Sequence, residues 1–129
     1  METDVAPPPV GAYVHYRREG DLLFLAGVGP RLPDSSGVAG GATRDEQGNA
    51  LEYDVVAQTE QVVANVRAIL EVAGSRLEKV IDVTVFLTDM QRDFADFNAT
   101  WARHFDGLGV TRTTVEVGAL PTPLAVAFK

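Results

Sequence analysis

The sequence predicts an α+β fold in which a mixed sheet carries two helices packed on one face. Two long segments place apolar residues at helical spacing, and shorter segments of alternating apolar and polar residues lie before, between and after them. The expected order is ββ(β)αβαββ, in which the bracketed strand is short. A length of 129 residues predicts one domain spanning residues 1–129.

The first part of the chain predicts a β-hairpin followed by a loop. Residues 12–18 and 22–26 are expected as strands, and Gly20 between them can supply the positive φ of a tight turn. Glycine, proline, serine and aspartate dominate residues 30–48, which indicates a loop. One short strand is expected after it, near Leu51.

Two amphipathic helices follow the loop. Asp54 is a suitable N-cap for the first, and Gly74 is a natural stop. Its apolar residues at helical spacing are Val55, Val56, Val62, Val63, Val66, Ile69, Leu70 and Ala73. The second helix has Asp89 or Asp93 as its cap and an aromatic stripe of Phe94, Phe97, Trp101 and Phe105.

Three further strands are expected at residues 79–87, 111–117 and 124–128. In the first of them, Ile81, Val83, Val85 and Leu87 point one way, while Asp82, Thr84 and Phe86 point the other. A sheet that two helices cover on one face leaves its other face without a partner. We therefore expect the chain to oligomerise, since a lone domain would expose a large apolar patch.

Composition excludes several classes of function. Without cysteine the chain has no disulfide framework, thiolate nucleophile or sulfur-ligated metal. A net charge of −7 without a lysine or arginine cluster argues against nucleic acid and anionic membranes as partners. The first residues do not form a signal peptide and no apolar run could span a bilayer, so we expect a cytoplasmic protein.

No catalytic motif of the common hydrolase, metalloprotease or nucleotide-binding types occurs. His15 and His104 are too few for a metal site without carboxylate help. The remaining candidate is the strand at residues 111–117, where Arg112, Thr114 and Glu116 share one face. An arginine beside a hydroxyl can hold a carboxylate. The alternative is a solvated strand face with an Arg–Glu ion pair.

Two further sets of polar residues are candidates. Asn98 lies inside the second helix, where asparagine is a weak helix former and often serves a hydrogen bond. A surface position is the alternative. Tyr13, His15 and Arg17 are expected on one face of the first strand, where an exposed edge-strand face is the alternative.

Several short motifs occur in an order that matches a known family. They are Val10-Gly11-Ala12-Tyr13, Leu25-Ala26-Gly27, residues 58–74, Val83-Thr84-Val85-Phe86, Phe97-Asn98-Ala99 and the most specific stretch, RTTVEVGALP at residues 112–121. With these motifs the chain resembles the Rid/YjgF family of reactive-intermediate deaminases over nearly its whole length. The triple proline, RTT at residues 112–114, LPTP at residues 120–123 and FLTDM at residues 86–90 most resemble 2-aminomuconate deaminases within that family.

The resemblance implies a chorismate-mutase-like fold and a homotrimer with three sites in clefts between subunits. It implies that Arg112 anchors the substrate carboxylate, that Asn98 and Tyr13 shape the cleft, and that Thr114 and the loop at Gly27 touch the substrate. An enamine such as 2-aminomuconate would tautomerise to its imine, and water would then release ammonia and leave the 2-oxo acid. This chemistry needs no metal or organic cofactor. A six-carbon dicarboxylate would need a second anion-binding group, for which Arg17 or His15 are candidates.

Two positions depart from the family pattern. The glutamate that family deaminases carry on the last strand is Ala127 here, and a serine of many relatives is Ala26. General acid–base help is typically worth about 10²- to 10⁴-fold, so the first departure bears on turnover. Three readings follow: the sequence is an engineered or inactive variant, another acid such as Glu116 substitutes, or the natural role is to bind small carboxylates without catalysis. A separate alternative, within the enzyme reading, is broad deamination of small imines such as 2-iminopropanoate.

Overall fold

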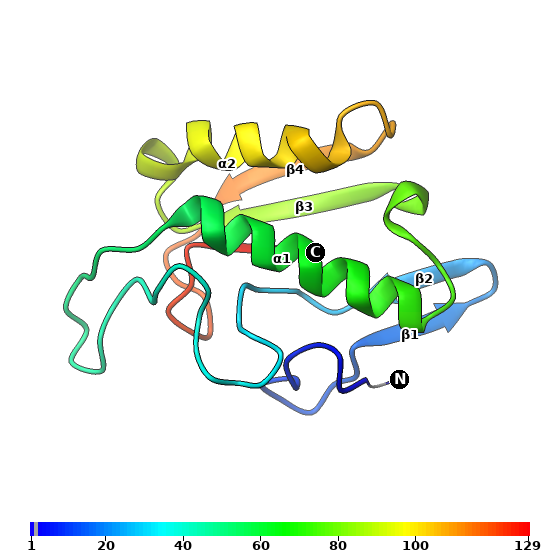
Figure 1. Ribbon diagram of the computed structural model, residues 1–129, viewed down its shortest axis with the longest axis horizontal. Coiled ribbons are helices and arrows are strands. Elements are labelled where there is room, and N and C mark those ends of the chain that lie inside the picture. The colour runs from blue at the N-terminus through cyan, green and yellow to red at the C-terminus, as the bar shows by residue number, and fades with distance from the viewer. Residues whose placement is uncertain (2) are drawn as a thin grey trace.

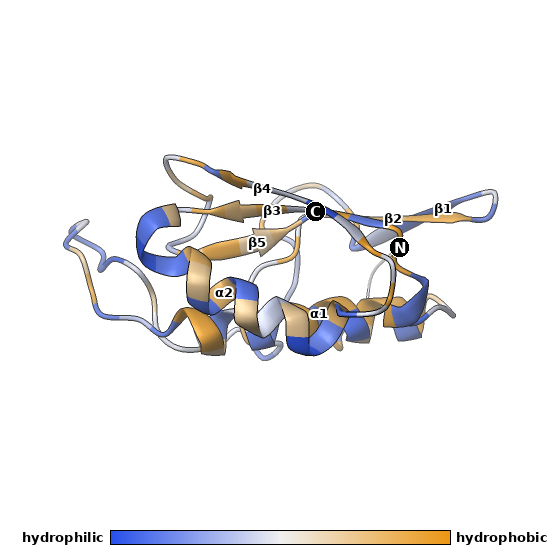
Figure 2. Ribbon diagram, turned by 90° about the horizontal axis from the view of Figure 1, so that it is seen from above, coloured by the Kyte–Doolittle hydropathy of each residue, from blue (hydrophilic) through white to orange (hydrophobic). Residues whose placement is uncertain are grey.

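In a computed structural model, which describes Met1 and residues 3–129, two helices lie on one side of a layer of strands (Figure 2). The elements in chain order are β1 (Tyr16–Glu19), β2 (Leu22–Leu25), α1 (Val55–Val72), a 3₁₀ helix (Leu77–Lys79), β3 (Asp82–Leu87), α2 (Met90–Phe105), β4 (Thr111–Glu116) and β5 (Val126–Phe128) (Figure 1). The predicted α+β order with both helices on one face is confirmed.

The strands form two small sheets. β1 and β2 pair as an antiparallel hairpin, and the second sheet has the order β4-β3-β5. β3 pairs parallel with β4 and antiparallel with β5, so this sheet is mixed as predicted. Val28 and Phe128 exchange two backbone hydrogen bonds of 2.8 Å, which link the segment after the hairpin to β5.

The register of the second sheet decides which side chains face the helices. Residues directly opposite each other in a ladder point to the same side of a sheet. Val83, Val85 and Leu87 of β3 are buried beneath the helices, and we call their side the helix face. By register Arg112, Thr114, Glu116, Val126 and Phe128 share it. The opposite side, the outer face, carries Asp82, Thr84, Phe86, Thr111, Thr113, Val115 and Ala127.

The helix ends follow the sequence signals. Asp54 accepts a hydrogen bond of 3.1 Å from the Ala57 N–H and so caps α1. At the other end Gly74 has φ +84°, and the N–H groups of Gly74 and Ser75 return to carbonyls of the last turn. This Schellman arrangement needs the left-handed conformation that glycine adopts without strain.

The aromatic stripe of α2 forms the centre of the core. Phe128 of β5 lies 6.2, 5.5 and 6.5 Å from the ring centres of Phe97, Trp101 and Phe105, and the last two rings stack at 4.0 Å. Phe94 at the start of the stripe stays partly exposed. α2 is thus fixed to the sheet by edge-on and tilted ring contacts to Phe128, which aromatic pairs favour.

The first strand is shorter than predicted. It begins at Tyr16, so Tyr13 and His15 precede β1 and do not share a strand face with Arg17. His15 is buried, with 7% of its surface exposed, while Arg17 is exposed. The backbone leaves the strand direction because both ring nitrogens of His15 bond to the backbone of residues near the N-terminus.

Other boundaries also shift. No named strand forms near Leu51 in the described residues, where a single bridge joins Arg44 to Ala50. β3 begins at Asp82 because Leu77–Lys79 forms a 3₁₀ turn, and Ile81 is 67% exposed instead of facing the core. β4 ends at Glu116, one residue early, and β5 begins at Val126, two residues late.

The cap of α2 is Asp89, which accepts a hydrogen bond from the Arg92 N–H, and Asp93 has a different role. Asp93 is buried and accepts hydrogen bonds from the Tyr53 hydroxyl at 2.5 Å and from Arg92 at 2.8 Å. Burial raises the pKa of Asp93, and these two hydrogen bonds oppose the rise. Burial and the Asp93 carboxylate raise the pKa of Tyr53 to about 12. This cluster ties the segment before α1 to α2.

The outer face of the strands carries no helix. Exposed apolar side chains gather there and on the hairpin, among them Leu22, Phe24 and Val115. Figure 2 shows both helices on the other side of the strands. These exposed apolar side chains, on the hairpin and at Val115, mark the surface for which the sequence analysis expects a partner.

An ion-pair cluster between the helices predicts acid-dependent stability. Glu60 of α1 accepts hydrogen bonds from two residues of α2, Arg103 at 2.9 Å and His104 at 2.7 Å. Burial alone would raise the pKa of Glu60, but these hydrogen bonds and charges outweigh it and lower the pKa from 4.5. A carboxylate with a lowered folded-state pKa stabilises the fold above its unfolded value and loses that contribution as pH falls.

We therefore expect Glu60→Gln to lower the free energy of unfolding at pH 7, by at most ~1 kcal/mol because the pair is solvent-screened. The difference in the free energy of unfolding between Glu60→Gln and the parent chain should shrink as the pH falls below 4.5. Urea melts at pH 7 and below pH 4.5 measure it. Glu46→Gln in an exposed loop is the matched control. An equal deficit at both pH values would contradict the assignment.

Candidate functional site

Arg112 is the second residue of β4, and its guanidinium lies against the aromatic stripe of α2. Its central carbon is 5.8, 5.2 and 5.1 Å from the ring centres of Phe94, Phe97 and Trp101. Such cation–π contacts are worth about 0.5–2 kcal/mol. β4 is the edge of its sheet, and Arg112 is half-buried. The side chain is therefore held on an apolar support at the rim of the fold.

Arg112 has no acidic partner among the described residues. The ion pairs of the described residues involve four other arginines and His104, so the predicted alternative of an Arg112–Glu116 pair is wrong. Burial lowers the pKa of Arg112 from its usual value, and a guanidinium stays charged at neutral pH. A half-buried cation without a counter-ion favours an anionic ligand, and a carboxylate can pair with it through two hydrogen bonds.

Thr114 lies two residues further along β4, on the same face as Arg112. Its hydroxyl oxygen is buried and has no hydrogen-bond partner within the described residues. An unsatisfied buried hydroxyl costs about 1–3 kcal/mol, which a polar ligand atom can recover. The hydroxyl and the guanidinium together offer a neutral and a charged group to one ligand.

Glu116 serves the fold. Its carboxylate accepts a hydrogen bond of 2.8 Å from the Met90 N–H at the first turn of α2. A carboxylate at this end of a helix is stabilised by the helix dipole and the free N–H groups. Glu116 is therefore already engaged four residues from Arg112, which weakens its candidacy as a replacement acid.

Asn98 is exposed on α2, on the side of the helix that reaches Arg112. Helical spacing places it in a row with Phe94 and Trp101, four residues before and three residues after it. Both of those rings contact the Arg112 guanidinium. Arg112 and Thr114 thus share one strand face, and helical spacing places Asn98 on the side of α2 nearest to Arg112.

Ala127 lies on the other side of the sheet. It pairs with Phe86 in the ladder between β3 and β5 and points to the outer face. Arg112 pairs with Val83 and points to the helix face. A carboxylate at position 127 would therefore face away from the guanidinium of its own chain.

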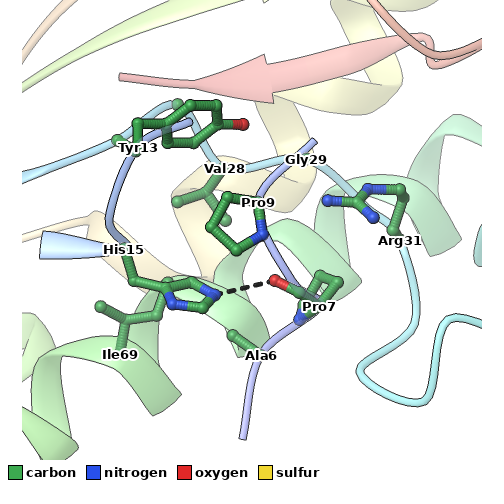
Figure 3. A pocket seen from close by; sticks show the side chains of 11 residues that line it. Ala6, Pro7, Pro9, Tyr13, His15, Val28, Gly29, Arg31 and Ile69 are labelled. Atoms are coloured by element: carbon green, nitrogen blue, oxygen red, sulfur yellow. Dashed lines mark hydrogen bonds between the residues drawn. The ribbon is translucent and has the colours of Figure 1, made fainter. Parts of the chain in front are cut away.

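Tyr13 and Gly27 line a separate small pocket, together with Pro7, Pro9, His15 and Arg31 (Figure 3). Arg112, Thr114 and Asn98 do not line it. Its volume of about 40 Å³ is far below the roughly 300–1,000 Å³ of pockets that enclose small molecules. Within one chain, the predicted site residues thus fall into the Arg112 group (Arg112, Thr114 and Asn98) and the pocket group (Tyr13 and Gly27), with Arg17 in neither. The pocket is too small to hold a substrate alone.

Hydrogen bonds fix His15 in one neutral form. Its Nδ1 accepts a hydrogen bond from the Thr3 N–H at 3.2 Å, and its Nε2 donates to the Pro7 carbonyl at 2.8 Å (Figure 3). A backbone N–H can only donate and a carbonyl can only accept, so the proton is on Nε2. This ring holds the N-terminal segment in place and is not available as a second anion-binding group.

Arg17 and Arg31 are two further cations in the N-terminal part of the chain, and only Arg31 lines the pocket. Arg17 pairs with Phe24 in the hairpin, is exposed and forms an ion pair of 3.4 Å with Glu19. Arg31 lines the pocket and donates to the Pro8 carbonyl at 2.6 Å. Asn65 on α1 fixes this loop by donating to the carbonyls of Gly29 and Arg31, each at 2.9 Å. The sequence did not identify Arg31 as a site residue, because its Gly- and Pro-rich loop shows no strand or helix periodicity that predicts where a side chain points.

The described residues contain no group of three or more histidines and acids that could hold a metal ion. No helix in the described part of the chain is long and apolar enough to cross a membrane. What the geometry offers is a cation on an aromatic support, an unsatisfied hydroxyl beside it and an amide on the facing helix. This set can bind and orient a small carboxylate.

Comparisons with known proteins match this fold and sequence. A family model described as Endoribonuclease L-PSP matches residues 3–127. A RutC family protein of Pyrococcus horikoshii is 38% identical over 98% of this chain and 94% of its own. The YjgF gene product of E. coli has a TM-score of 0.78 at 31% identity, over 98% of this chain and 91% of that one. E. coli TdcF, solved with bound serine, has a TM-score of 0.79 at 30% identity, over 99% and 92%.

Trp101 provides a direct test of carboxylate binding at Arg112. It is the single tryptophan of the chain and lies 5.1 Å from the guanidinium, so a bound anion should change its emission. We expect saturable quenching or enhancement on titration with pyruvate, and its loss in Arg112→Ala. Arg76→Ala, which removes an exposed arginine elsewhere, is the control. An unchanged titration in Arg112→Ala would contradict the assignment.

Proposed function

The chain belongs to the Rid/YjgF (RutC-like, L-PSP) family, and on that premise we propose that it hydrolyses enamine or imine amino acids to 2-oxo acids and ammonia. The observation that carries the proposal is the unpaired, half-buried Arg112 with the orphaned Thr114 hydroxyl beside it. A relative of the same fold has been solved with serine, itself an amino acid with a carboxylate, bound to it. A carboxylate-binding arginine in this chain agrees with that precedent.

The proposed reaction requires the protein only to bind the substrate, to orient one water molecule and to allow proton transfer. The enamine is protonated on carbon to give its imine, water adds to the C=N carbon, and proton transfer to nitrogen lets ammonia depart as the C=O bond forms. Arg112 holds the carboxylate through two N–H groups, and Thr114 hydrogen-bonds the adjacent polar atom of the substrate. Asn98 lies at the rim, where its amide can orient the water. Fixing the substrate and water in this way replaces a bimolecular encounter with an oriented one.

A complete site needs more than one chain. We propose that the chain forms a homotrimer and that the group around Tyr13 and Gly27 of one subunit closes over the Arg112 group of another. Two features support this: the pocket at Tyr13 and Gly27 is too small alone, and exposed apolar side chains such as Phe24 and Val115 lie on the hairpin and the outer face. An enclosed site would exclude water other than the reacting molecule and strengthen the Arg112–carboxylate pair.

The substrate we propose first is 2-aminomuconate, which has two carboxylates. The second carboxylate needs its own cation, and Arg31 in the pocket group meets that need better than the buried His15. Arg17, on the outer side of the hairpin, is the other cation that a neighbouring subunit could use. The alternative within the same chemistry is a small monocarboxylate such as 2-iminopropanoate, for which Arg112 alone suffices.

RNA cleavage, which the description of the matching family model names, fits this chain poorly. Binding to nucleic acid relies on lysine and arginine to neutralise phosphates. The net charge is −7, and the described arginines are spread over the chain and several are already paired. A guanidinium set among aromatic rings suits one small anion better than a polyanion.

A second candidate function is carboxylate binding without turnover. Ala127 favours it, because the position that family deaminases give to a glutamate has no acid here. The two functions share the Arg112 group and differ only in what happens to the bound substrate.

Ammonia release tests the proposal. With freshly generated 2-aminomuconate and, separately, 2-iminopropanoate, we expect turnover by the parent chain that falls at least 100-fold in Arg112→Ala. Arg76→Ala is the matched control and should keep the parent rate. A preference for 2-aminomuconate that Arg31→Ala removes would support the dicarboxylate assignment.

Ala127→Glu separates the two candidate functions. If the parent binds the 2-oxo acid but releases no ammonia, and Ala127→Glu gains turnover, the parent chain is a carboxylate binder on a deaminase scaffold. If neither chain turns over either substrate, the deaminase proposal is wrong.

The proposed trimer has its own test. Val115→Asp places a charge on the outer face, so we expect sedimentation equilibrium to change from three chains to one, with loss of ammonia release. Val72→Asp introduces the same charge at an exposed valine of α1, away from the outer face, and should leave the mass unchanged. A parent chain that sediments as a monomer would refute the trimer.

A further inference from the structure

β4 and α2 run in opposite directions and contact each other at both ends of the Arg112 group (Figure 1). At one end the Glu116 carboxylate accepts the 2.8 Å hydrogen bond from the Met90 N–H. At the other end the Arg112 guanidinium lies 5.1 Å from the ring centre of Trp101. Four residues of a strand span about 13 Å and eleven residues of a helix about 16 Å, so these contacts bound one common stretch. Thr114 lies midway between them along β4.

The backbone that carries Glu116 is fixed to the rest of the sheet. Glu116 pairs with Leu87 in the ladder between β3 and β4, and the Val117 N–H donates to the Leu87 carbonyl at 2.9 Å. α2 begins at Met90, after a short connection from β3. Because β4 is held along its ladder, the Glu116 carboxylate reaches the start of the helix from a rigid element.

Glu116 makes the one hydrogen bond between β4 and α2 that the described residues form. Arg112 contacts the rings of α2 through cation–π interactions. Such a contact accepts a range of cation positions within about 6 Å of a ring centre, so it does not set where the helix lies along the strand. A charge-assisted hydrogen bond does, because its length and direction are both restricted. The position of α2 relative to β4 therefore depends on Glu116.

Separate contacts keep the first turn of α2 folded. Asp89 caps it through the Arg92 N–H, and the buried Asp93 accepts a hydrogen bond from the Tyr53 hydroxyl. The Arg92 guanidinium donates to the Tyr53 carbonyl at 3.0 Å. These bonds join the turn to itself and to the segment before α1. Removing the Glu116 carboxylate should therefore let the start of α2 move relative to β4 without unfolding it.

The groups between β4 and α2 depend on the distance between the two elements. The Thr114 hydroxyl is buried on this side of the sheet without a partner among the described residues, and Arg112 is half-buried against the rings. If α2 moved away from β4, water would reach both groups. A pair between Arg112 and a bound carboxylate would then weaken, because the effective dielectric constant around it would rise.

We infer that Glu116 is a positioning residue for the Arg112 group. Its carboxylate fixes the start of α2 against β4, and so keeps the aromatic support of Arg112 and the Thr114 hydroxyl in place for a bound carboxylate. The role needs an acceptor oxygen at position 116 and not an acid, because the hydrogen bond runs from the Met90 N–H to that oxygen. The inference rests on the proposed binding of a carboxylate at Arg112, and it gives Glu116 no part in proton transfer.

Two substitutions at position 116 test this role in the pyruvate titration followed by Trp101 emission. Glu116→Gln keeps an acceptor oxygen and Glu116→Ala removes it, while both remove the acid and the negative charge. We expect Glu116→Ala to bind pyruvate at least fivefold more weakly than Glu116→Gln. Pyruvate does not react in this titration, so a residue that only supplied a proton would give both variants the same affinity. Equal affinity in the two variants would overturn the inference.

Asp54→Ala is the matched control for general destabilisation, because it removes the N-terminal hydrogen bond of α1 to the Ala57 N–H. It should lower thermal stability and keep the parent's affinity for pyruvate. A loss of affinity equal to that of Glu116→Ala would show a general effect and contradict the positioning role. A parent chain that binds no pyruvate would refute the Arg112 site, and with it both this role and the proposed function. If the parent binds pyruvate and Arg112→Ala does not, a failure at position 116 leaves the proposed function standing.

Discussion

The parallel pairing of β3 with β4 is the constraint on which the arrangement of the site depends. It sets Arg112 opposite Val83 and Thr114 opposite Val85, so both polar side chains face the same way as the core of the sheet. A shift of one residue would turn them to the outer face and bring Thr113 and Val115 beneath α2, because side chains alternate along a strand. The aromatic stripe of α2 then meets a guanidinium at the edge of the core. Fold and candidate site are thus specified by one register.

Placing Arg112 there has an energetic consequence. A cation that is half-buried without a counter-ion loses part of its hydration free energy. The cation–π contacts with the three rings of α2 offset only part of that loss. The neighbouring Thr114 hydroxyl adds a second unsatisfied group. A fold optimised for stability alone would place an acid opposite this arginine, as α1 and α2 do with Glu60 and Arg103. Local departures from that rule are expected where a ligand supplies the missing partner.

Much of the fold could be predicted because its signals are local. The caps at Asp54 and Gly74, the apolar periodicity of both helices and the alternation in β3 each depend on neighbours within a few residues. The errors arise where distant contacts decide. Tyr13 and His15 alternate with Arg17 as in a strand, yet His15 bonds to Thr3 and Pro7 and bends the backbone. Asp93 looks like a cap, but Tyr53 and Arg92 hold it inside. The backbone of Arg31 is held by a hydrogen bond from Asn65, 34 residues away, and no local sequence pattern predicts that contact.

The face of the sheet to which a side chain points also determines what the absence of a glutamate at position 127 can mean. Because Ala127 points to the outer face and Arg112 to the helix face, the two positions cannot contribute to one site within one chain. A carboxylate at position 127 would reach a substrate held by Arg112 only if that substrate lay against the outer face of another subunit. The outer face, with its exposed Val115, and the small pocket at Tyr13 are the surfaces that such a neighbour would bring. In the proposed trimer, position 127 would therefore belong to a contact between subunits, and an alanine there leaves the Arg112 group of the same chain intact.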